Sequence, residues 1–263
     1  MSELIQLSQH GAILTLTLNR PEKYNAINDE MLATLYAEVR RFAVSDELQV
    51  MLIKGNGAYF SAGADLRSGL VPDFSSRSPR AIRGWLRGSE HSLTPLAELI
   101  EAIEKPVVVA HNGPCFGGAL ELSLSCDFRL AAEHAMYLLP ETRLGAVPSA
   151  GGTARLTRMI GPHWARWMLI AGKKIDAAKA EAIGLVHAVY LQADFDAEVD
   201  AFCRSLAEMP PEAIGATKVA IELVADLGSA AARNVERIAT SALVFGDELE
   251  ACMAAAQRRV GPK

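Results

Sequence analysis

The sequence has no long apolar run, few cysteines and no excess of positive charge, and each shortage excludes a class of protein. No apolar stretch approaches the roughly 20 residues that a membrane-spanning helix needs, so we expect no contact with a membrane. The four cysteines form no CxxC pair and no zinc-type spacing with the six histidines. The net charge of −5 over 263 residues argues against a broad face for nucleic acid.

A secretion signal is also missing. The start carries an early glutamate, Glu3, and no basic segment ahead of an apolar run. We therefore expect reduced thiols and a cytoplasmic protein, with an organelle matrix as the alternative. Half of the residues are hydrophobic and 22% are charged, which is typical of a soluble globular protein with a full core.

Several short catalytic and binding motifs are absent as well. The glycines match neither the phosphate loop GxxxxGK[ST] nor the dinucleotide motif GxGxxG. The absence of GxSxG argues against an α/β-hydrolase. No Ser/His/Asp or Cys/His arrangement stands out, so the candidates for chemistry are carboxylates and backbone groups.

Short β-branched stretches alternate with turns and helical patterns in the first part of the chain. Asn28 is placed as the N-cap of a helix in which Met31, Leu35 and Val39 follow a helical phase. Strands are predicted over residues 12–18, 49–54, 107–110, 128–132 and 135–139. This alternation predicts an α/β fold.

From about residue 195 the chain is rich in Ala, Leu and Glu and has no strand signal. We therefore predict a catalytic core over residues 1–194 and a C-terminal helical region over residues 195–263. Helices are predicted over residues 196–207, 211–225, 230–245 and 247–259. Residues 67–88 are rich in Ser, Pro, Gly and Arg and are predicted to be a loop leading into a helix. Their arginines are either solvated or meet an anionic ligand.

Two glutamates stand in apolar or glycine-rich surroundings, where a carboxylate is costly to bury. Glu121 lies in GGALELS, and Glu141 lies in LLPETRLGAVPSAGG. An unpaired buried charge costs several kcal/mol, so it usually shifts its pKa or marks chemistry. The alternative is that each glutamate is exposed, with Arg143 pairing with Glu141.

Two stretches of small residues could present backbone N–H groups to a ligand. FSAGADL, residues 60–66, allows close approach to the main chain, and Ala64 N–H is the best candidate donor there. Gly117 and Gly118 would open a helix whose first N–H groups lack internal partners, which makes Gly118 N–H a candidate oxyanion donor. The alternatives are a tight turn at the first stretch and, because apolar residues alternate, a strand at the second.

Taken in order, five stretches resemble the crotonase family, also called the enoyl-CoA hydratase/isomerase superfamily. They are NRPEKYNAIN, FSAGADL, KPVVVAHNGPCFGGALELSLSCD, LPETRLGAVPSAGGTARLTRMIG and AKAEAIGLVHAV. The resemblance implies a spiral of repeated ββα turns, with C-terminal helices that build a homotrimer or a dimer of trimers. The stretch EACMAAAQRRVGPK departs from the family's EGxxAFxEKRxPxF pattern, which leaves the acyl preference open.

The resemblance also implies roles for individual residues. Ala64 N–H and Gly118 N–H would form the oxyanion hole for a thioester carbonyl, and Glu121 and Glu141 would be the two catalytic glutamates. Coenzyme A is then part of the substrate, and no metal or separate cofactor is implied. The implied substrate-binding residues are Lys23, Ala26, Ala62, Asp65, Leu66, Pro140 and Gly145.

The activity implied is hydration of 2-enoyl-CoA thioesters to 3-hydroxyacyl-CoA, or the reverse dehydration. In this interpretation Glu121 mainly orients and activates water, and Glu141 exchanges a proton at the α-carbon. The alternatives are a Δ3,Δ2-enoyl-CoA isomerase, another acyl-CoA lyase or hydrolase of the family, and a non-catalytic relative that binds acyl-CoA or RNA. The acidic charge argues against RNA, and the two glutamates argue against loss of catalysis.

Overall fold

The computed structural model describes residues 4–68, 70, 78–88 and 92–260. Within these residues, six strands form one sheet in the order β1-β2-β3-β4-β6-β9. Their bounds are β1 (Ile5–His10), β2 (Ile13–Leu18), β3 (Val50–Gly55), β4 (Val107–His111), β6 (Phe128–Ala132) and β9 (Ala188–Tyr190). The β1–β2 pair is antiparallel and the other neighbours are parallel.

Residues that come after β4 in the sequence form a second, smaller sheet. It consists of β5 (Cys115–Phe116), β7 (Met136–Leu138) and β8 (Ile175–Asp176). β5 and β7 are parallel, and β7 and β8 are antiparallel. Because β5 comes four residues after the end of β4, this sheet begins next to the carboxyl end of a central strand of the large sheet.

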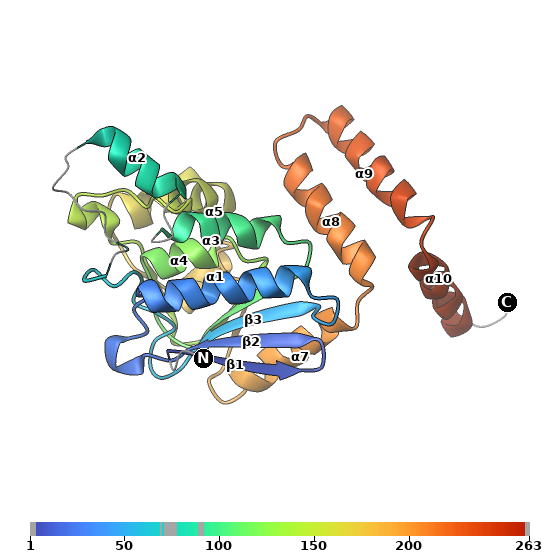
Figure 1. The fold of residues 1–263 in the computed structure, drawn as a ribbon, viewed down its shortest axis with the longest axis horizontal. Helices are drawn as coiled ribbons and strands as arrows, with labels where there is room; N and C mark the ends of the chain where they lie inside the picture. Colours follow the sequence, from blue (N-terminus) through green and yellow to red (C-terminus); the bar gives the residue numbers. More distant parts are fainter. Residues whose placement is uncertain (1–3, 69, 71–77, 89–91, 261–263) are drawn as a thin grey trace. The chain divides into compact units, whose positions relative to one another are not determined.

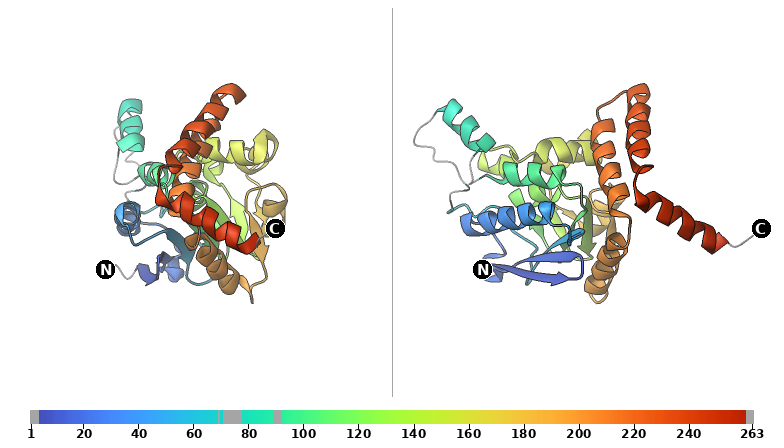
Figure 2. Two further views of the ribbon diagram at one scale, coloured as in Figure 1. Left: turned by 90° about the vertical axis from the view of Figure 1, so that its right-hand side faces the viewer. Right: turned by 45° about the vertical axis from the view of Figure 1, so that its right-hand side comes forward.

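Helices alternate with these strands. They are α1 (Asp29–Val44), α2 (Pro79–Gly88), α3 (Leu93–Ala102), α4 (Gly118–Ser123), α5 (Gly152–Leu169) and α6 (Ala177–Ala182), with the short 3-10 helices η1 (Pro21–Lys23) and η3 (Glu141–Leu144). Figures 1 and 2 show α1 and α3 side by side, with α1 running along the strands β1 to β3. The prediction of an α/β fold is confirmed.

Local sequence explains where α1 begins and ends. The Asn28 side chain accepts a hydrogen bond from Met31 N at 3.0 Å, so the predicted N-cap is confirmed. Lys105 Nζ donates to the carbonyl oxygens of Phe42 and Ser45 at the other end of the helix. The residues that α1 buries are Met31, Leu32, Leu35, Val39 and Phe42, whose spacing places one face of the helix on the core.

The central strand β4 is buried over its whole length, as expected for a parallel strand covered on both faces. The predicted strand over residues 128–132 matches β6, and the other predicted strands overlap β2, β3, β4 and β7. Four strands were not predicted: the short strands β5, β8 and β9, and the six-residue strand β1. The last residues of β1 are exposed and polar, and it is held by its antiparallel pairing with β2.

Contacts divide the chain into one compact unit over Met1–Arg204 and a second over Ser205–Lys263. The predicted C-terminal helices are confirmed as α7 (Phe195–Ala207), α8 (Pro211–Val224), α9 (Ser229–Leu243) and α10 (Asp247–Val260). Phe202 of α7 contacts Phe128 of β6, with ring centroids 5.1 Å apart. In the described part of the chain, no helix has the length and apolar character to cross a membrane.

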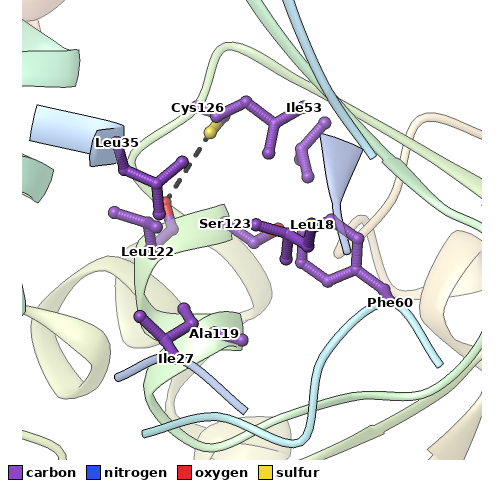
Figure 3. Close-up of a pocket in the computed structure, with 10 residues that line it drawn as sticks. Leu18, Ile27, Leu35, Ile53, Phe60, Ala119, Leu122, Ser123 and Cys126 are labelled. Carbon is purple, nitrogen blue, oxygen red and sulfur yellow. Dashed lines mark hydrogen bonds between the residues drawn. The ribbon is translucent and has the colours of Figure 1, made fainter. Parts of the chain in front are cut away.

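A buried cavity of about 10 Å³ lies beneath α4 (Figure 3). Leu35 of α1, Leu122 of α4 and Phe60 are among the apolar side chains around it. Cys126 Sγ closes one side by donating to Leu122 O at 3.7 Å. A void of this size holds about one water molecule, so it is a gap in core packing and not a substrate site.

Candidate active site

The segment of residues 60–66 lies between two other stretches that are far from it in sequence. On one side, Phe116 N donates to Ser61 O at 3.0 Å, and Ser61 bridges to the first residue of β5. On the other side, Asp65 N donates to Ile27 O at 2.7 Å. Three of the stretches singled out in the sequence therefore meet at the beginning of α4.

Two backbone N–H groups come together at this point. A methyl group added to Gly118 would lie 3.6 Å from Ala64 N, and one added to Gly63 would lie 3.1 Å from Gly118 N. Neither Ala64 N–H nor Gly118 N–H donates a hydrogen bond within the described part of the chain. Gly118 begins α4, so the prediction of a helix here is confirmed and the alternative of a strand is wrong. Two unengaged donors side by side can bind one carbonyl oxygen.

Glu121 lies one turn further along α4 and is 5% exposed. Its Oε2 accepts hydrogen bonds from Ala150 N at 2.8 Å and Gly152 N at 3.0 Å. Burial, and then the nearby charge of Glu141, raise the pKa of Glu121 to about 7, although the backbone N–H donors oppose the change. The alternative of an exposed Glu121 is therefore wrong.

Glu141 is the first residue of η3; it follows Pro140 and lies three residues after the end of β7. A methyl group added to Gly117 would lie 3.2 Å from Glu141 Oε1. Glu141 Oε2 is buried and accepts no hydrogen bond from the described residues. Burial raises the pKa of the Glu141 carboxyl. Arg143 donates instead to Gly172 O, so it does not form the pair considered from the sequence.

The structure thus brings the four candidate catalytic groups together around the first turn of α4. Gly118 carries one N–H and lies beside Ala64, Gly117 lies beside the Glu141 carboxylate, and Glu121 is held on the same helix. The charge of Glu141 contributes to the raised pKa of Glu121, so the two carboxyl groups lie close enough to interact electrostatically. The arrangement places two carboxyl groups, which can act as acid and base, next to two N–H donors that can bind an oxygen atom.

The predicted substrate-binding residues lie on both sides of this point. Ala26 and Ala62 are half-buried, whereas Lys23, at the end of η1, and Leu66 are exposed. Pro140 precedes η3 and contacts the position of Gly117. Contact of these residues with a substrate remains a prediction.

Asp65 and Gly145 have structural roles that the sequence only partly indicates. Asp65 Oδ2 accepts from Arg20 Nη1 at 2.7 Å, and Asp65 Oδ1 accepts from Arg67 N at 3.0 Å. The bond from Arg20, above all, lowers the pKa of Asp65. Asp65 therefore caps a turn and ties residues 60–66 to the chain before η1. Gly145 is exposed and ends η3 with φ of 76°.

The predicted loop and helix over residues 67–88 is described only in part. Residues 69 and 71–77, which include Arg77, lie outside the described residues. The helix is α2, and its Arg80, Arg83 and Arg87 are exposed. Contact of the arginines of residues 67–88 with an anionic ligand remains a prediction.

Sequence reasoning missed the residues that hold the loop around Glu121. Arg155 of α5 donates two hydrogen bonds to the Glu101 carboxylate of α3, and its Nη1 donates to Ala150 O at 2.6 Å. Glu101 and Arg155 are 54 positions apart, so no local spacing connects them. The local sequence offers one signal, the glycine pair Gly151 and Gly152, which is typical of an irregular loop.

Known proteins resemble this chain over most of its length. Residues 8–256 match the family described as enoyl-CoA hydratase/isomerase. The 2,3-dehydroadipyl-CoA hydratase of Escherichia coli (strain K12) is 38% identical over 191 residues, covering 72% of this chain and 70% of that protein. The carnitinyl-CoA dehydratase of Citrobacter koseri is 36% identical over 222 residues, covering 83% and 80%. A crystal structure of an enoyl-CoA hydratase from Bacillus anthracis superposes with a TM-score of 0.86 at 29% identity, covering 97% of this chain and 96% of that chain.

Proposed function

Because this chain belongs to the enoyl-CoA hydratase/isomerase family, also called the crotonase family, we propose that it adds water to 2-enoyl-CoA thioesters or catalyses the reverse dehydration. The observation that carries the proposal is the buried Glu121 carboxylate and the half-buried Glu141 carboxylate beside two unengaged N–H groups. Relatives named as a hydratase and as a dehydratase support the same reaction type.

The N–H groups of Ala64 and Gly118 are proposed to bind the thioester carbonyl oxygen. Negative charge develops on this oxygen when water attacks the β-carbon, because the electrons of the double bond move toward the carbonyl. Fixed donors stabilise that charge more than they stabilise the neutral substrate. Loss of one such donor typically lowers the rate by about 10²–10³-fold.

The two carboxyl groups are proposed to handle the protons. Ionised Glu121 takes a proton from water as the oxygen bonds to the β-carbon, and protonated Glu141 gives a proton to the α-carbon. The pair therefore holds one proton before and after the reaction, so atoms and charge balance. Burial raises the pKa of both carboxyl groups, so each holds a proton more readily than an exposed carboxyl group does, which supports a role in proton transfer.

A panel of thioesters tests the proposal. Purified protein is mixed with straight, branched and aromatic 2-enoyl-CoA thioesters, and the loss of conjugated-enoyl absorbance is followed. We expect loss with at least one member, and mass spectrometry should show a product heavier by one water. A 3-enoyl-CoA thioester is measured alongside. Gain of conjugated-enoyl absorbance from that substrate, with no hydration of any 2-enoyl thioester, would instead identify an isomerase.

A further inference from the structure

Arg155 connects α3 to the loop that holds the Glu121 carboxylate. Its guanidinium donates to both Glu101 carboxylate oxygens and to Ala150 O. The N–H of the same Ala150 donates to Glu121 Oε2. A continuous path of hydrogen bonds therefore runs from Glu101 through Arg155 and residue 150 to the proposed catalytic carboxylate.

Two glycines let this path fit. A methyl group added to Gly151, whose φ is 87°, would lie 1.8 Å from Arg155 Nη1. A methyl group added to Gly152 would lie 2.6 Å from Glu121 Oε2. The loop is thus held by Arg155 on one side and donates to Glu121 on the other, with no room for a side chain at either position.

The pair is well suited to holding a fixed position. The Arg155 side chain is 15% exposed and the Glu101 side chain 33%, and a paired guanidinium and carboxylate form a geometrically specific contact. The Glu101 bond, above all, raises the pKa of Arg155, and the charge of Glu121 contributes. The charged groups that surround Glu121 are Glu141 from η3 and Arg155 from α5, with Glu101 and Glu98 of α3 behind the guanidinium.

We propose that Arg155, anchored by Glu101, is a positioning residue that orients the Glu121 carboxylate through the backbone N–H groups of Ala150 and Gly152. This inference rests on the proposed function of Glu121. Arg155 does not contact the reacting atoms in this account. Its action is to fix two donors to Glu121 Oε2, which in turn fix the direction in which the other carboxylate oxygen points.

The first test separates positioning from a purely structural contact between α3 and α5. Arg155→Met is compared with Lys105→Met, which removes another cation that donates to backbone carbonyls, at the opposite end of β4 from the site. We expect Arg155→Met to lower kcat per folded molecule by about 10- to 100-fold with KM nearly unchanged, since a small misplacement can cost that much. Lys105→Met should leave kcat unchanged. Equal kcat in Arg155→Met and the wild type would overturn the proposal.

A second measurement does not depend on activity. The carboxyl carbon of Glu121 is titrated by NMR in protein labelled at glutamate side chains, and its signal is assigned by its absence in Glu121→Gln. In Arg155→Met the midpoint should rise by roughly one pH unit, because fixed donors and a positive charge are lost and Glu101 is left unpaired. An unchanged midpoint would contradict the proposal, whether or not any enoyl thioester is hydrated. Failure of hydration alone would overturn only the proposed function.

Two further variants keep the test informative if Arg155→Met does not fold. Arg155→Lys keeps the charge, but lysine lacks the planar guanidinium that reaches all three acceptors. We therefore expect kcat to fall, by a smaller factor than in Arg155→Met. Glu101→Gln weakens the anchor, and the double variant Glu101→Gln/Arg155→Lys should be no slower than Arg155→Lys alone, because residues acting as a unit are not additive. Full activity in Arg155→Lys, or a double variant whose loss equals the product of the two single losses, would contradict the proposal.

Discussion

Glu121 destabilises the folded state when it is ionised. The carboxyl releases its proton at a pKa of about 4.5 in the unfolded chain and about 7 in the folded one. Between these values the folded state binds more protons than the unfolded state, so this group's contribution to stability falls as pH rises through that window. The difference corresponds to about 3 kcal/mol above pH 7. The fold tolerates this cost where the proposed chemistry needs a carboxyl that titrates near neutral pH.

Glu121→Gln should therefore make the protein more stable at high pH. The glutamine oxygen can still accept from the N–H groups of Ala150 and Gly152, but it carries no charge. We expect the variant to exceed the wild type in free energy of unfolding by up to about 3 kcal/mol near pH 8, and by much less near pH 5. Urea unfolding at both pH values measures this. A variant less stable than the wild type near pH 8 would show that the pKa of Glu121 is not raised.

Gly152→Ala should damage the site while the fold survives. The added methyl would lie 2.6 Å from Glu121 Oε2 and 2.7 Å from Glu121 Cγ, so the carboxylate has to move. We expect kcat to fall by about 10- to 100-fold and the free energy of unfolding to fall by about 1–3 kcal/mol. Gly228→Ala makes the same change where a methyl meets open space, and it should leave kcat unaltered. Equal kcat in the two variants would contradict the described geometry.

At the scale of elements, the site depends on α4, a helix of six residues that is too short to be stable alone. The last residue of α4, Ser123, takes part in a hydrogen-bond network of buried polar side chains. His111 Nε2 lies 2.8 Å from Ser123 Oγ, and His111 Nδ1 lies 3.0 Å from the Tyr137 hydroxyl. Burial, followed by the charge of Arg129, lowers the pKa of His111 to about 3. The neutral ring can therefore donate to one neighbour and accept from the other.

Arg129 supports the same end of α4. Its guanidinium is buried and donates to Cys126 O at 2.6 Å and to Leu185 O at 2.8 Å. Arg129→Met removes these two hydrogen bonds and leaves an apolar side chain among buried polar groups, so the free energy of unfolding should fall by about 3 kcal/mol. Arg40→Met, at an exposed position of α1, should change it by about 0.5 kcal/mol or less. Urea unfolding compares the two, and equal losses would show that Arg129 does not hold α4.

Elements were predictable where local sequence carries the information. Asn28 is an N-cap by residue type, and the run Val107–His111 is apolar enough for a central parallel strand. β1 was missed because residues such as Gln6 and Gln9 follow no apolar alternation. For α4, alternation of apolar residues left helix and strand open, and burial on all sides removed the periodicity that would have decided it.

At the scale of the whole molecule, the family and its α/β fold with C-terminal helices were predictable from five stretches in order, and both are confirmed. The candidate catalytic residues were also identifiable, since each lies inside one of those stretches. The support around them was not, because the contact of Glu101 with Arg155 depends on how α3 and α5 pack. The acyl group of the substrate was not predictable for the same reason, since the shape of an acyl site depends on how distant elements pack.

The C-terminal helices carry exposed apolar side chains that fit the predicted self-association. Ile221 on α8, Ile238 on α9 and Phe245 after α9 are 59%, 71% and 90% exposed, and such side chains commonly mark interfaces. We expect sedimentation to give three or six times the chain mass of 28.2 kDa. Phe245→Asp should shift the distribution toward smaller species, and Val44→Asp, at an exposed position just inside the end of α1, should not. A wild-type monomer at micromolar concentration would contradict the prediction.

The central claim is that two carboxylates hydrate an enoyl thioester, and the kcat of Glu121→Gln and Glu141→Gln tests it most directly. Each variant is assayed with the 2-enoyl-CoA thioester that the wild type hydrates fastest, with Gly228→Ala as the folded control. The account predicts that each glutamine lowers kcat by about 10²–10⁴-fold while circular dichroism stays unchanged. Hydration at the wild-type rate by Glu121→Gln would contradict it.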